Sequence, residues 1–550
     1  MEQYNIAQAL NEMAMRAPFR PAIIFPAGRD ARARAKYTQL TFQQLNTLCD
    51  AYAHGLAGYD IQKGERVLMM VRPGVELIAA TFALLKIGAV PVLIDPGMGR
   101  KAFLQCVADA QPTAMIGIPL AHILHTLFPK AFHTIKRTIT VGKRLFWGGA
   151  TLAELESQTR APFPAAATTL EDEAAVAFTS GGTGIPKGVV YSHGIFRKQI
   201  EIMRTEMGVA EGDIHLAVMY IFALFNPALG VTTVIPDMDP RKTAQVNPAY
   251  LVESIETHGI TMSLGSPLIW KILSDYCLTH DICLPSLKLM FMFGDVVMPE
   301  VVENCTKILP YGKIYTPYGA TEALPLTLMS GADILTETAQ KTRQGAGVCV
   351  GTPVGGLRVR IIPIRETPIR QWDDSLALPV GQIGEIVVKG DVVTRLYLNR
   401  PQQTDEAKIP DQDGPWHRMG DLGYLDEQER LWVCGRKAHR VETARGLLLP
   451  VQCEAIFNQH PAAARSALVG VGQFGQQRAV IIIEIKPGNA VKSNKARQRL
   501  IAELLELGRR HEHTRHIQDV LFHPSFPVDV RHNTKIDRLK LAAWAAKQLR

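Results

Sequence analysis

Small hydroxyl residues, glycines and one lysine are concentrated in the stretch Phe178-Thr179-Ser180-Gly181-Gly182-Thr183-Gly184-Ile185-Pro186-Lys187-Gly188. Glycines let backbone N–H groups approach an anion closely, and a lysine adds a positive charge, so this composition predicts a phosphate-binding loop. An apolar run over 174–178 predicts a strand that leads into the loop. The Walker pattern does not fit, because Pro186 precedes Lys187 and Gly188 follows it. An ordinary glycine-rich turn is the alternative.

Four further segments follow along the chain: Tyr318-Gly319-Ala320-Thr321-Glu322, Met419-Gly420-Asp421, Cys434-Gly435-Arg436 and Asn533-Thr534-Lys535-Ile536-Asp537-Arg538. The Glu322 carboxylate is a suitable ligand for a hard cation such as Mg²⁺. Taken singly, each residue also has a structural explanation. Asp421 could be a turn residue, Glu322 a carboxylate at a helix N-terminus, and Lys535 a solvated cation. Their order along the chain matches the order of motifs in a known superfamily that they resemble, and this resemblance favours the functional interpretation.

Together these segments resemble the motifs of the adenylate-forming superfamily, which includes acyl-CoA synthetases, luciferases and the adenylation domains of peptide synthetases. The resemblance implies that a carboxylate attacks the α-phosphate of ATP to give an acyl-adenylate and pyrophosphate. It implies catalytic roles for Lys187, Thr321, Glu322 and Lys535, with Glu322 holding Mg²⁺, Asp421 the ribose and Lys535 the carboxylate and phosphate oxygens. The residues implied to bind ATP are Thr179, Ser180, Gly181, Gly182, Thr183, Gly184, Lys187, Gly294, Asp295, Tyr318, Gly319, Ala320, Thr321, Asp421, Arg436 and Lys535.

The chain departs from that superfamily at three positions. The hinge, two residues after the arginine of Gly435-Arg436, is commonly Asp or Lys in the superfamily and is Ala438 here. Thr534 replaces the usual glycine before the catalytic lysine, and Gly182 stands where Ser or Thr is common. These departures bear on transfer to a thiol more than on adenylation.

A narrower resemblance is to the β-lactone synthetases of bacterial long-chain olefin biosynthesis. It rests on the segments 236–240, 316–325, 416–421, 435–441 and 529–536. It implies that a 2-alkyl-3-hydroxy fatty acid is adenylated and that its own β-hydroxyl displaces AMP, an intramolecular step that gains from proximity. It also implies thiolase-like, reductase and lactone-decarboxylase partners of the same pathway. Tyr220, Phe222 and Phe225 are candidates for the acyl pocket, although a hydrophobic core would have the same composition.

Three functions therefore compete: β-lactone formation, fatty acyl-CoA or acyl-carrier ligation, and a non-catalytic nucleotide-binding or scaffold role. The feature that separates the first two is the hinge residue, Ala438. The base that takes the hydroxyl proton is not identified by the sequence, since His417, His439 and His532 each have a structural explanation.

Composition limits the class of protein. The chain has 550 residues, of which 47% are hydrophobic and 20% charged, with a net charge of +8. The basic residues are scattered and no nucleic-acid motif accompanies them. The absence of a C-x-x-C pair and of a signal peptide favours the cytoplasm. The uncharged stretch 216–235 is interrupted by Asn226, Pro227 and Gly230, so we interpret it as a pocket wall rather than a membrane helix, and weak membrane association stays open.

Alternating strand and helix patterns predict an α/β fold. Strands are expected at 66–70, 89–94 and 114–118, with a helix at 75–86, which indicates a mostly parallel sheet. A β-rich segment follows from 384 to 433. We expect a large N-terminal domain of layered α/β subdomains over 1–434 and a small, mobile α+β domain over 435–550 that carries Lys535.

Overall fold

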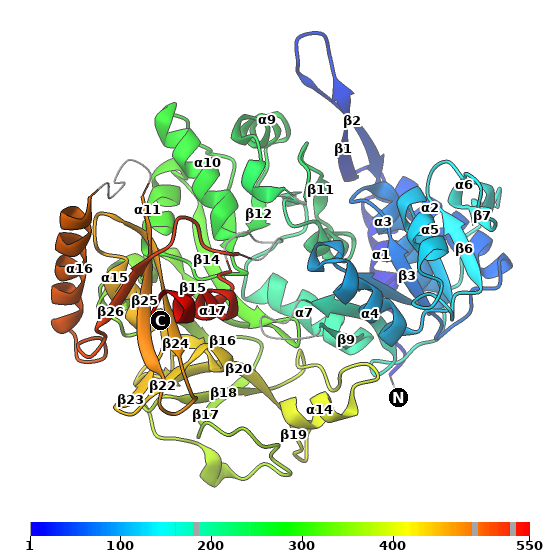
Figure 1. The fold of residues 1–550 in the computed structure, drawn as a ribbon. Helices are drawn as coiled ribbons and strands as arrows, with labels where there is room; N and C mark the ends of the chain where they lie inside the picture. The colour runs from blue at the N-terminus through cyan, green and yellow to red at the C-terminus, as the bar shows by residue number, and fades with distance from the viewer. Residues whose placement is uncertain are drawn as a thin grey trace.

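The computed structural model describes residues 2–159, 161–179, 186–240, 242–486, 493–528 and 535–549. Two large sheets flanked by helices and a smaller sheet near the C-terminus make up this part of the chain, so the predicted α/β class is confirmed. Figure 1 shows the sheet built from strands between residues 66 and 192 on the right and the larger sheet in the centre and below. The C-terminal elements lie on the left.

The first sheet has the strand order β7-β6-β5-β3-β4-β8-β9 among the described residues. All neighbours in it are parallel except β8 and β9, which form a hairpin. Its strands are β3 (Arg66–Met70), β4 (Val90–Ile94), β5 (Ala114–Gly117), β6 (Arg137–Thr140), β7 (Ala150–Thr151), β8 (Glu173–Thr179) and β9 (Lys187–Ser192).

Helices cover both faces of this sheet. Side chains of α2 (Phe42–Gly58) and α3 (Val75–Ile87) pack in one core with Val67 and Met69, whereas α4 (Arg100–Ala110) and α5 (Pro119–Leu127) pack in another with Leu68. Alternate residues of β3 therefore face different cores. Helix α3 has no charge between Glu76 and Lys86, which suits its burial, and it ends at Gly88, whose φ of +79° an L side chain rarely adopts.

The second sheet is mixed. Its path within the described residues is β17-β18-β20-β21-β16-β15-β14-β13-β12-β10-β11-β1-β2, with β19 paired to β20. Neighbours from β14 through β11 to β1 are parallel, and the β-rich half from β15 to β17 is antiparallel. The strands of the first half are β1 (Pro21–Arg29), β2 (Ala35–Thr41), β10 (Ile214–Leu216), β11 (Thr232–Val234), β12 (Met262–Gly265), β13 (Leu289–Met292) and β14 (Lys313–Ala320). Those of the second half are β15 (Ala323–Ser330), β16 (Val348–Pro353), β17 (Arg358–Ile362), β18 (Gly384–Lys389), β19 (Lys408–Ile409), β20 (Trp416–Leu425) and β21 (Leu431–Arg436).

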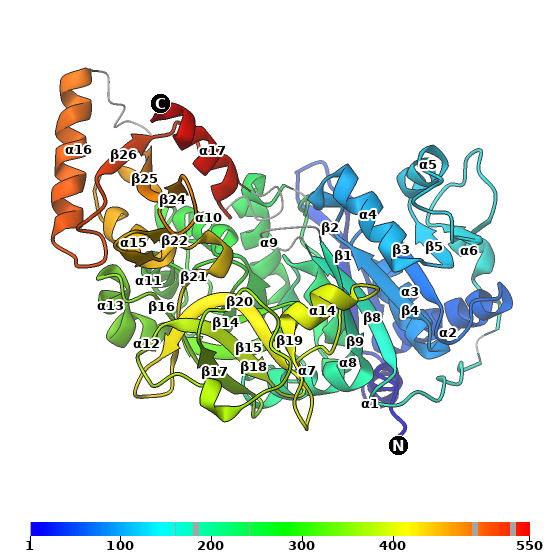
Figure 2. The same cartoon turned by 60° about the horizontal axis from the view of Figure 1, so that its bottom comes forward.

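Most of the remaining elements of the large part connect or cover these sheets (Figure 2). They are α1 (Gln8–Arg16), η1 (Pro96–Met98), α6 (Leu152–Leu155), α7 (His193–Thr205), α9 (Pro248–His258), α10 (Pro267–Thr279), α11 (Pro299–Ile308), α12 (Gly331–Asp333), α13 (Ala339–Arg343) and α14 (Pro401–Ala407). The stretch 216–235 forms β10, η2 (Tyr220–Phe225), α8 (Asn226–Leu229) and β11. Across the described residues, no helix has the length and apolarity needed to span a membrane.

The elements after Arg436, which we call the small unit, include a third sheet with apolar cores of its own. A three-stranded sheet of β24 (Ala463–Val471), β25 (Arg478–Ile485) and β26 (Asp519–Phe522) packs with α15 (Pro450–Phe457), α16 (Asn494–Arg509) and α17 (Arg538–Gln548), beside a hairpin of β22 (Val441–Thr443) and β23 (Gly446–Leu448). Its two apolar cores contain only residues from Val441 onward. A domain boundary after residue 434 and the mobility of this unit stay predictions.

Candidate active site

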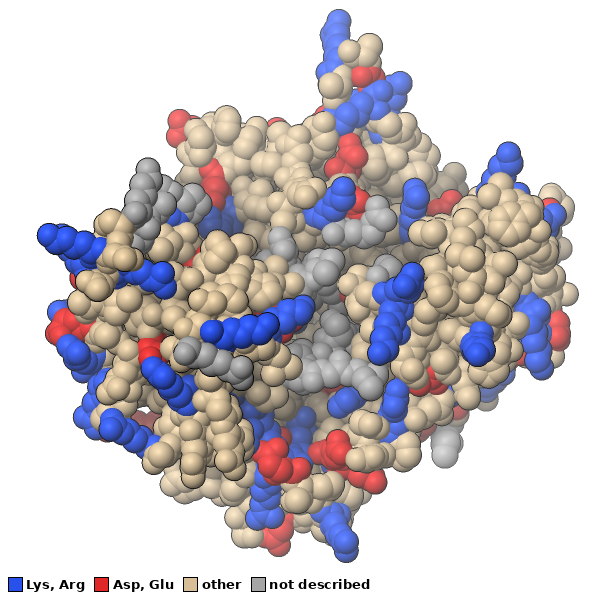
Figure 3. All heavy atoms as spheres, in the orientation of Figure 1, with Lys and Arg blue, Asp and Glu red and all other residues tan. Residues whose placement is uncertain are grey.

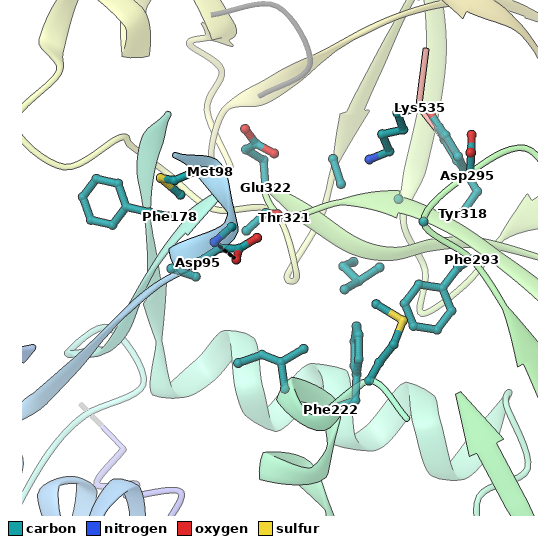
Figure 4. Close-up of a pocket in the computed structure, with 18 of the residues that line it drawn as sticks. Asp95, Met98, Phe178, Phe222, Phe293, Asp295, Tyr318, Thr321, Glu322 and Lys535 are labelled. Atoms are coloured by element: carbon teal, nitrogen blue, oxygen red, sulfur yellow. Dashed lines mark hydrogen bonds between the residues drawn. The ribbon is translucent and has the colours of Figure 1, made fainter. Parts of the chain in front are cut away.

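A single cavity of about 2510 Å³ brings the predicted site residues together. It is larger than a typical ligand pocket of about 300–1,000 Å³. Every predicted site residue whose side chain is described lines it: Lys187, Tyr220, Phe222, Phe225, Gly294, Asp295, Tyr318, Gly319, Ala320, Thr321, Glu322, Asp421, Arg436, Ala438 and Lys535. Figure 4 shows Thr321 and Glu322 near the middle, with Lys535 approaching from the small unit. The roles assigned to these residues stay predictions.

The predicted phosphate loop joins β8 to β9. Thr179 pairs with Lys187 in this hairpin, which fixes both ends of the loop at the cavity. Ser180, Gly181, Gly182, Thr183 and Gly184 lie outside the described residues, and Thr179 is described by its backbone alone. The Nζ atom of Lys187 lies 4.6 Å from the ring centroid of Tyr397, a cation–π distance that holds this charge at the cavity.

Glu322 is held in place by residues far from it in the sequence. The Tyr397 hydroxyl donates a 2.6 Å hydrogen bond to Glu322 Oε1. The backbone N–H of Thr394 donates to the Glu322 carbonyl oxygen at 2.9 Å, and the Tyr191 hydroxyl donates to the carbonyl of Thr321 at 2.6 Å. Burial raises the pKa of Tyr397 above its usual value, so the phenol stays protonated and keeps donating.

A buried lysine lies behind Glu322. Lys408 is 5% exposed and its Nζ donates to the carbonyl oxygen of Thr394, the residue that contacts the Glu322 backbone. Burial lowers the pKa of Lys408 to about 7, and the Glu322 carboxylate acts in the opposite direction. His417 is the β20 partner of Lys408 in register, and burial holds its pKa well below the usual value, so its ring is neutral.

Sequence reasoning did not identify Tyr397, Thr394 or Lys408. The only local signal is a single lysine between two apolar residues, Ala407 and Ile409. This region therefore adds a second basic side chain, beside Lys187, to the surroundings of Glu322.

A second group of polar side chains in the cavity is built around Asp421. The Tyr318 hydroxyl donates a 2.6 Å hydrogen bond to Asp421 Oδ2, and Arg436 Nε lies 3.2 Å from Asp421 Oδ1. Asp421 and Arg436 are partners in the antiparallel pairing of β20 and β21, so backbone register brings the two charges together. Burial, and next the negative charge of Asp421, raises the pKa of Tyr318, which keeps its hydroxyl a donor.

Small residues let the backbone approach the cavity. A Cβ on Gly319 would lie 2.5 Å from the Ala323 carbonyl oxygen, so a larger residue there would force the turn between β14 and β15 to shift. Gly294 follows β13 with a φ of +93°, which favours glycine, and Asp295 beside it lines the cavity. Both turns present backbone to the site.

Aromatic side chains close the apolar side. Phe222 on η2 packs edge-on against Phe293 with ring centroids 4.9 Å apart, and Phe225 meets Phe196 at 5.7 Å. Phe222 and Phe293 lie together in Figure 4, on the side away from Glu322. The predicted acyl candidates thus form a wall of the same cavity as the polar residues.

Charge on the molecular surface is dispersed. Figure 3 shows Lys and Arg side chains spread over the viewed face rather than gathered in one patch.

At the start of the small unit, Ala438 is exposed in the short helix η6 (Lys437–His439), between the ion pairs Lys437–Glu385 at 3.3 Å and Arg440–Glu366 at 2.7 Å.

Similarity to known proteins identifies the family of this chain. Residues 10–398 match the family model described as AMP-binding enzyme, so the chain belongs to this family and is an adenylate-forming, AMP-forming enzyme. It is 45% identical to an olefin β-lactone synthetase of Stenotrophomonas maltophilia over 99% of this chain and 98% of the relative. It is equally 45% identical, with the same coverage, to an olefin β-lactone synthetase of Xanthomonas campestris.

A solved structure confirms the fold. An anthranilate CoA ligase in complex with anthranoyl-AMP superposes with a TM-score of 0.80 at 18% identity, covering 100% of this chain and 98% of the other. Both resemblances stated from the sequence, to the adenylate-forming superfamily and to the β-lactone synthetases, are therefore confirmed.

Proposed function

We propose that the protein adenylates a 2-alkyl-3-hydroxy long-chain fatty acid and closes the product to a β-lactone, with release of pyrophosphate and AMP. The observation that carries the proposal is the 45% identity to two olefin β-lactone synthetases along almost the whole chain. The proposed setting is the cytoplasm, within a pathway whose other enzymes supply the hydroxy acid and consume the lactone.

In the first step a carboxylate oxygen attacks the α-phosphorus of ATP, an O–P bond forms, and the bond to pyrophosphate breaks. We assign Lys535 to the carboxylate and α-phosphate oxygens, Thr321 to phosphate and Lys187 to the departing pyrophosphate. Asp421 holds the ribose hydroxyls. Positioning and neutralisation of charge are the main contributions that a protein makes to such a transfer.

A magnesium ion fits the residues present. Mg²⁺ is commonly bound by one or two carboxylates together with substrate phosphates. Glu322 offers one carboxylate, oriented by Tyr397, and the described residues contain no cluster of three or more His, Cys, Asp or Glu that would hold a metal without a nucleotide. When bound, the ion neutralises phosphate charge.

In the second step the β-hydroxyl oxygen attacks the acyl carbonyl carbon, AMP leaves with its phosphate oxygen, and the hydroxyl proton is released. The nucleophile belongs to the same molecule as the electrophile, so no acceptor thiol is needed. We further propose that residues 435–550 form the small domain that brings Lys535 to the cavity.

Transfer to coenzyme A is the second candidate. The 2-succinylbenzoate–CoA ligase of Bacillus cytotoxicus is 25% identical over 83% of this chain and 86% of its own length. The lower identity makes this the weaker proposal, and Ala438 replaces the usual hinge residue.

The test is to incubate the purified protein with ATP, Mg²⁺ and a racemic 2-alkyl-3-hydroxy long-chain acid, with and without CoA, and to identify the product by NMR. A β-lactone and AMP formed without CoA are expected. A thioester that appears only with CoA would overturn the proposal. The matched blank is Lys535→Ala, which shows whether the product depends on adenylation at this site.

A further inference from the structure

The cavity reaches both faces of the first sheet, the one that contains β3. Met69 and Met70 are consecutive residues at the end of β3, so their side chains point to opposite faces, yet both line the cavity. Met69 belongs to the core of α2 and α3, and Met70 packs against the core of α4 and α5. The cavity therefore curves around the carboxyl end of β3.

Two apolar regions of the cavity result, which we name arm A and arm B. Arm A lies on the α3 side and is lined by Phe82, Leu85, Ile200, Leu224 and Phe225. Arm B lies on the α4 side and is lined by Met70, Met98, Phe103, Leu104 and Leu124. All ten side chains are buried or half-buried.

The polar residues lie between the arms. In Figure 4, Met98 and Phe178, which pack in the same core as the residues of arm B, lie on one side of Thr321 and Glu322. Phe222 and Phe293, which pack against the same core as the residues of arm A, lie on the other. A linear fatty acid would need one apolar region leading away from the reacting carboxylate. The proposed substrate carries two alkyl chains on neighbouring carbons, so its chains diverge from a point next to that carboxylate.

We propose that arm A and arm B each hold one of the two alkyl chains of the substrate, so that this one cavity selects an acid branched at carbon 2. The inference rests on the proposed function and extends it to substrate recognition. Moving each methylene group of an alkyl chain from water to an apolar surface lowers the free energy of binding. Blocking one arm should therefore weaken binding of substrates whose long chain occupies that arm and leave binding of the others unchanged.

The experiment narrows each arm in turn. Leu104 in arm B and Leu224 in arm A are both half-buried leucines that line the cavity, so Leu104→Trp and Leu224→Trp form a matched pair. Two acids are compared: one with a long chain on carbon 3 and a methyl on carbon 2, the other with these reversed. The readout is kcat/KM for pyrophosphate release, with the folded state of each variant checked by circular dichroism.

Reciprocal losses are expected. Each variant should lower kcat/KM about tenfold or more for one acid while leaving the other within about twofold, and the affected acid should switch between the variants. Equal losses with both acids, or no loss with Leu104→Trp, would overturn the proposal. If Leu104→Trp does not fold, Leu124→Trp replaces it in arm B.

Pyrophosphate release reports adenylation, so the arms are tested even if no lactone forms. Failure of the proposed function would appear as adenylation without lactone in the wild type. Failure of the two-arm inference would appear as equal responses of the two acids, with lactone still formed.

Discussion

The cavity is lined by residues up to Arg436, here called the large side, and by residues of the small unit, here called the small side. The two sides hold their polar side chains differently. On the large side, Glu322 and Asp421 each accept a 2.6 Å hydrogen bond from a tyrosine, and Asp421 also pairs with Arg436. On the small side, Lys535 is exposed and belongs to a unit with its own cores. On the proposed assignments, the side that binds the nucleotide is built in advance, whereas the charge that would act on the carboxylate comes from the small unit.

The largest effect should follow from removing the charge on the small side. Lys535→Ala should slow adenylation by about 100-fold or more, because the developing phosphate charge loses a positioned cation. The melting temperature should hardly change, since exposed charges contribute little stability. Single-turnover pyrophosphate release measures the first effect and thermal unfolding the second.

Lys547→Ala is the matched control, because Lys547 is exposed near the far end of α17 and does not line the cavity. It should behave as the wild type in both assays. Adenylation by Lys535→Ala at the wild-type rate would contradict the assignment of Lys535.

The next effect tests the large side. Tyr397→Phe removes the hydrogen bond to the Glu322 carboxylate, and bonds to charged groups are the stronger ones, so we expect the Mg²⁺ concentration needed for half-maximal rate to rise about tenfold. Tyr191→Phe is the matched control, because it removes a bond of the same length from the neighbouring carbonyl of Thr321. That variant should lose about 1 kcal/mol of stability and keep its Mg²⁺ dependence. Identical Mg²⁺ titrations for the two variants would show that Tyr397 does not orient Glu322.

The residues that could be predicted from the sequence are those that local spacing defines. Thr321, Glu322 and Asp421 lie in short segments whose order along the chain is informative, and the strands β3, β4 and β5 follow from short apolar runs. These signals depend only on neighbouring residues.

The supporting residues could not be predicted in this way. Tyr397 lies 75 positions from Glu322, and it also forms an isolated bridge with Val189, a residue still farther away along the chain. Likewise, the pairing of β16 with β21 joins segments about 80 residues apart, so one mixed sheet replaces what the sequence presents as two patterns. Such contacts are set by tertiary packing rather than by local propensity.

A smaller effect concerns Lys408, which lies behind Glu322 on the large side of the cavity. With its pKa lowered to about 7 in the fold, the native state holds one proton fewer than the unfolded state between pH 7 and the ordinary lysine pKa. The free energy of unfolding of the wild type should therefore rise with pH across this window relative to Lys408→Met, by at most about 1.4 kcal/mol per pH unit. Urea unfolding at pH 7, 8 and 9 measures the difference. Parallel curves for the two proteins would show that Lys408 is not held in this state.

The smallest effect is expected at Ala438, the predicted hinge residue. Ala438 is exposed, so Ala438→Asp should change stability by less than about 0.5 kcal/mol. Lactone formation should stay within about twofold of the wild type, because an intramolecular nucleophile needs no second arrangement of the small unit to admit a thiol. Product analysis with and without CoA, alongside Ala438→Lys, measures this. If Ala438→Asp adenylates normally but forms lactone slowly, ring closure depends on movement at this residue. The small side of the cavity then acts in both adenylation and ring closure.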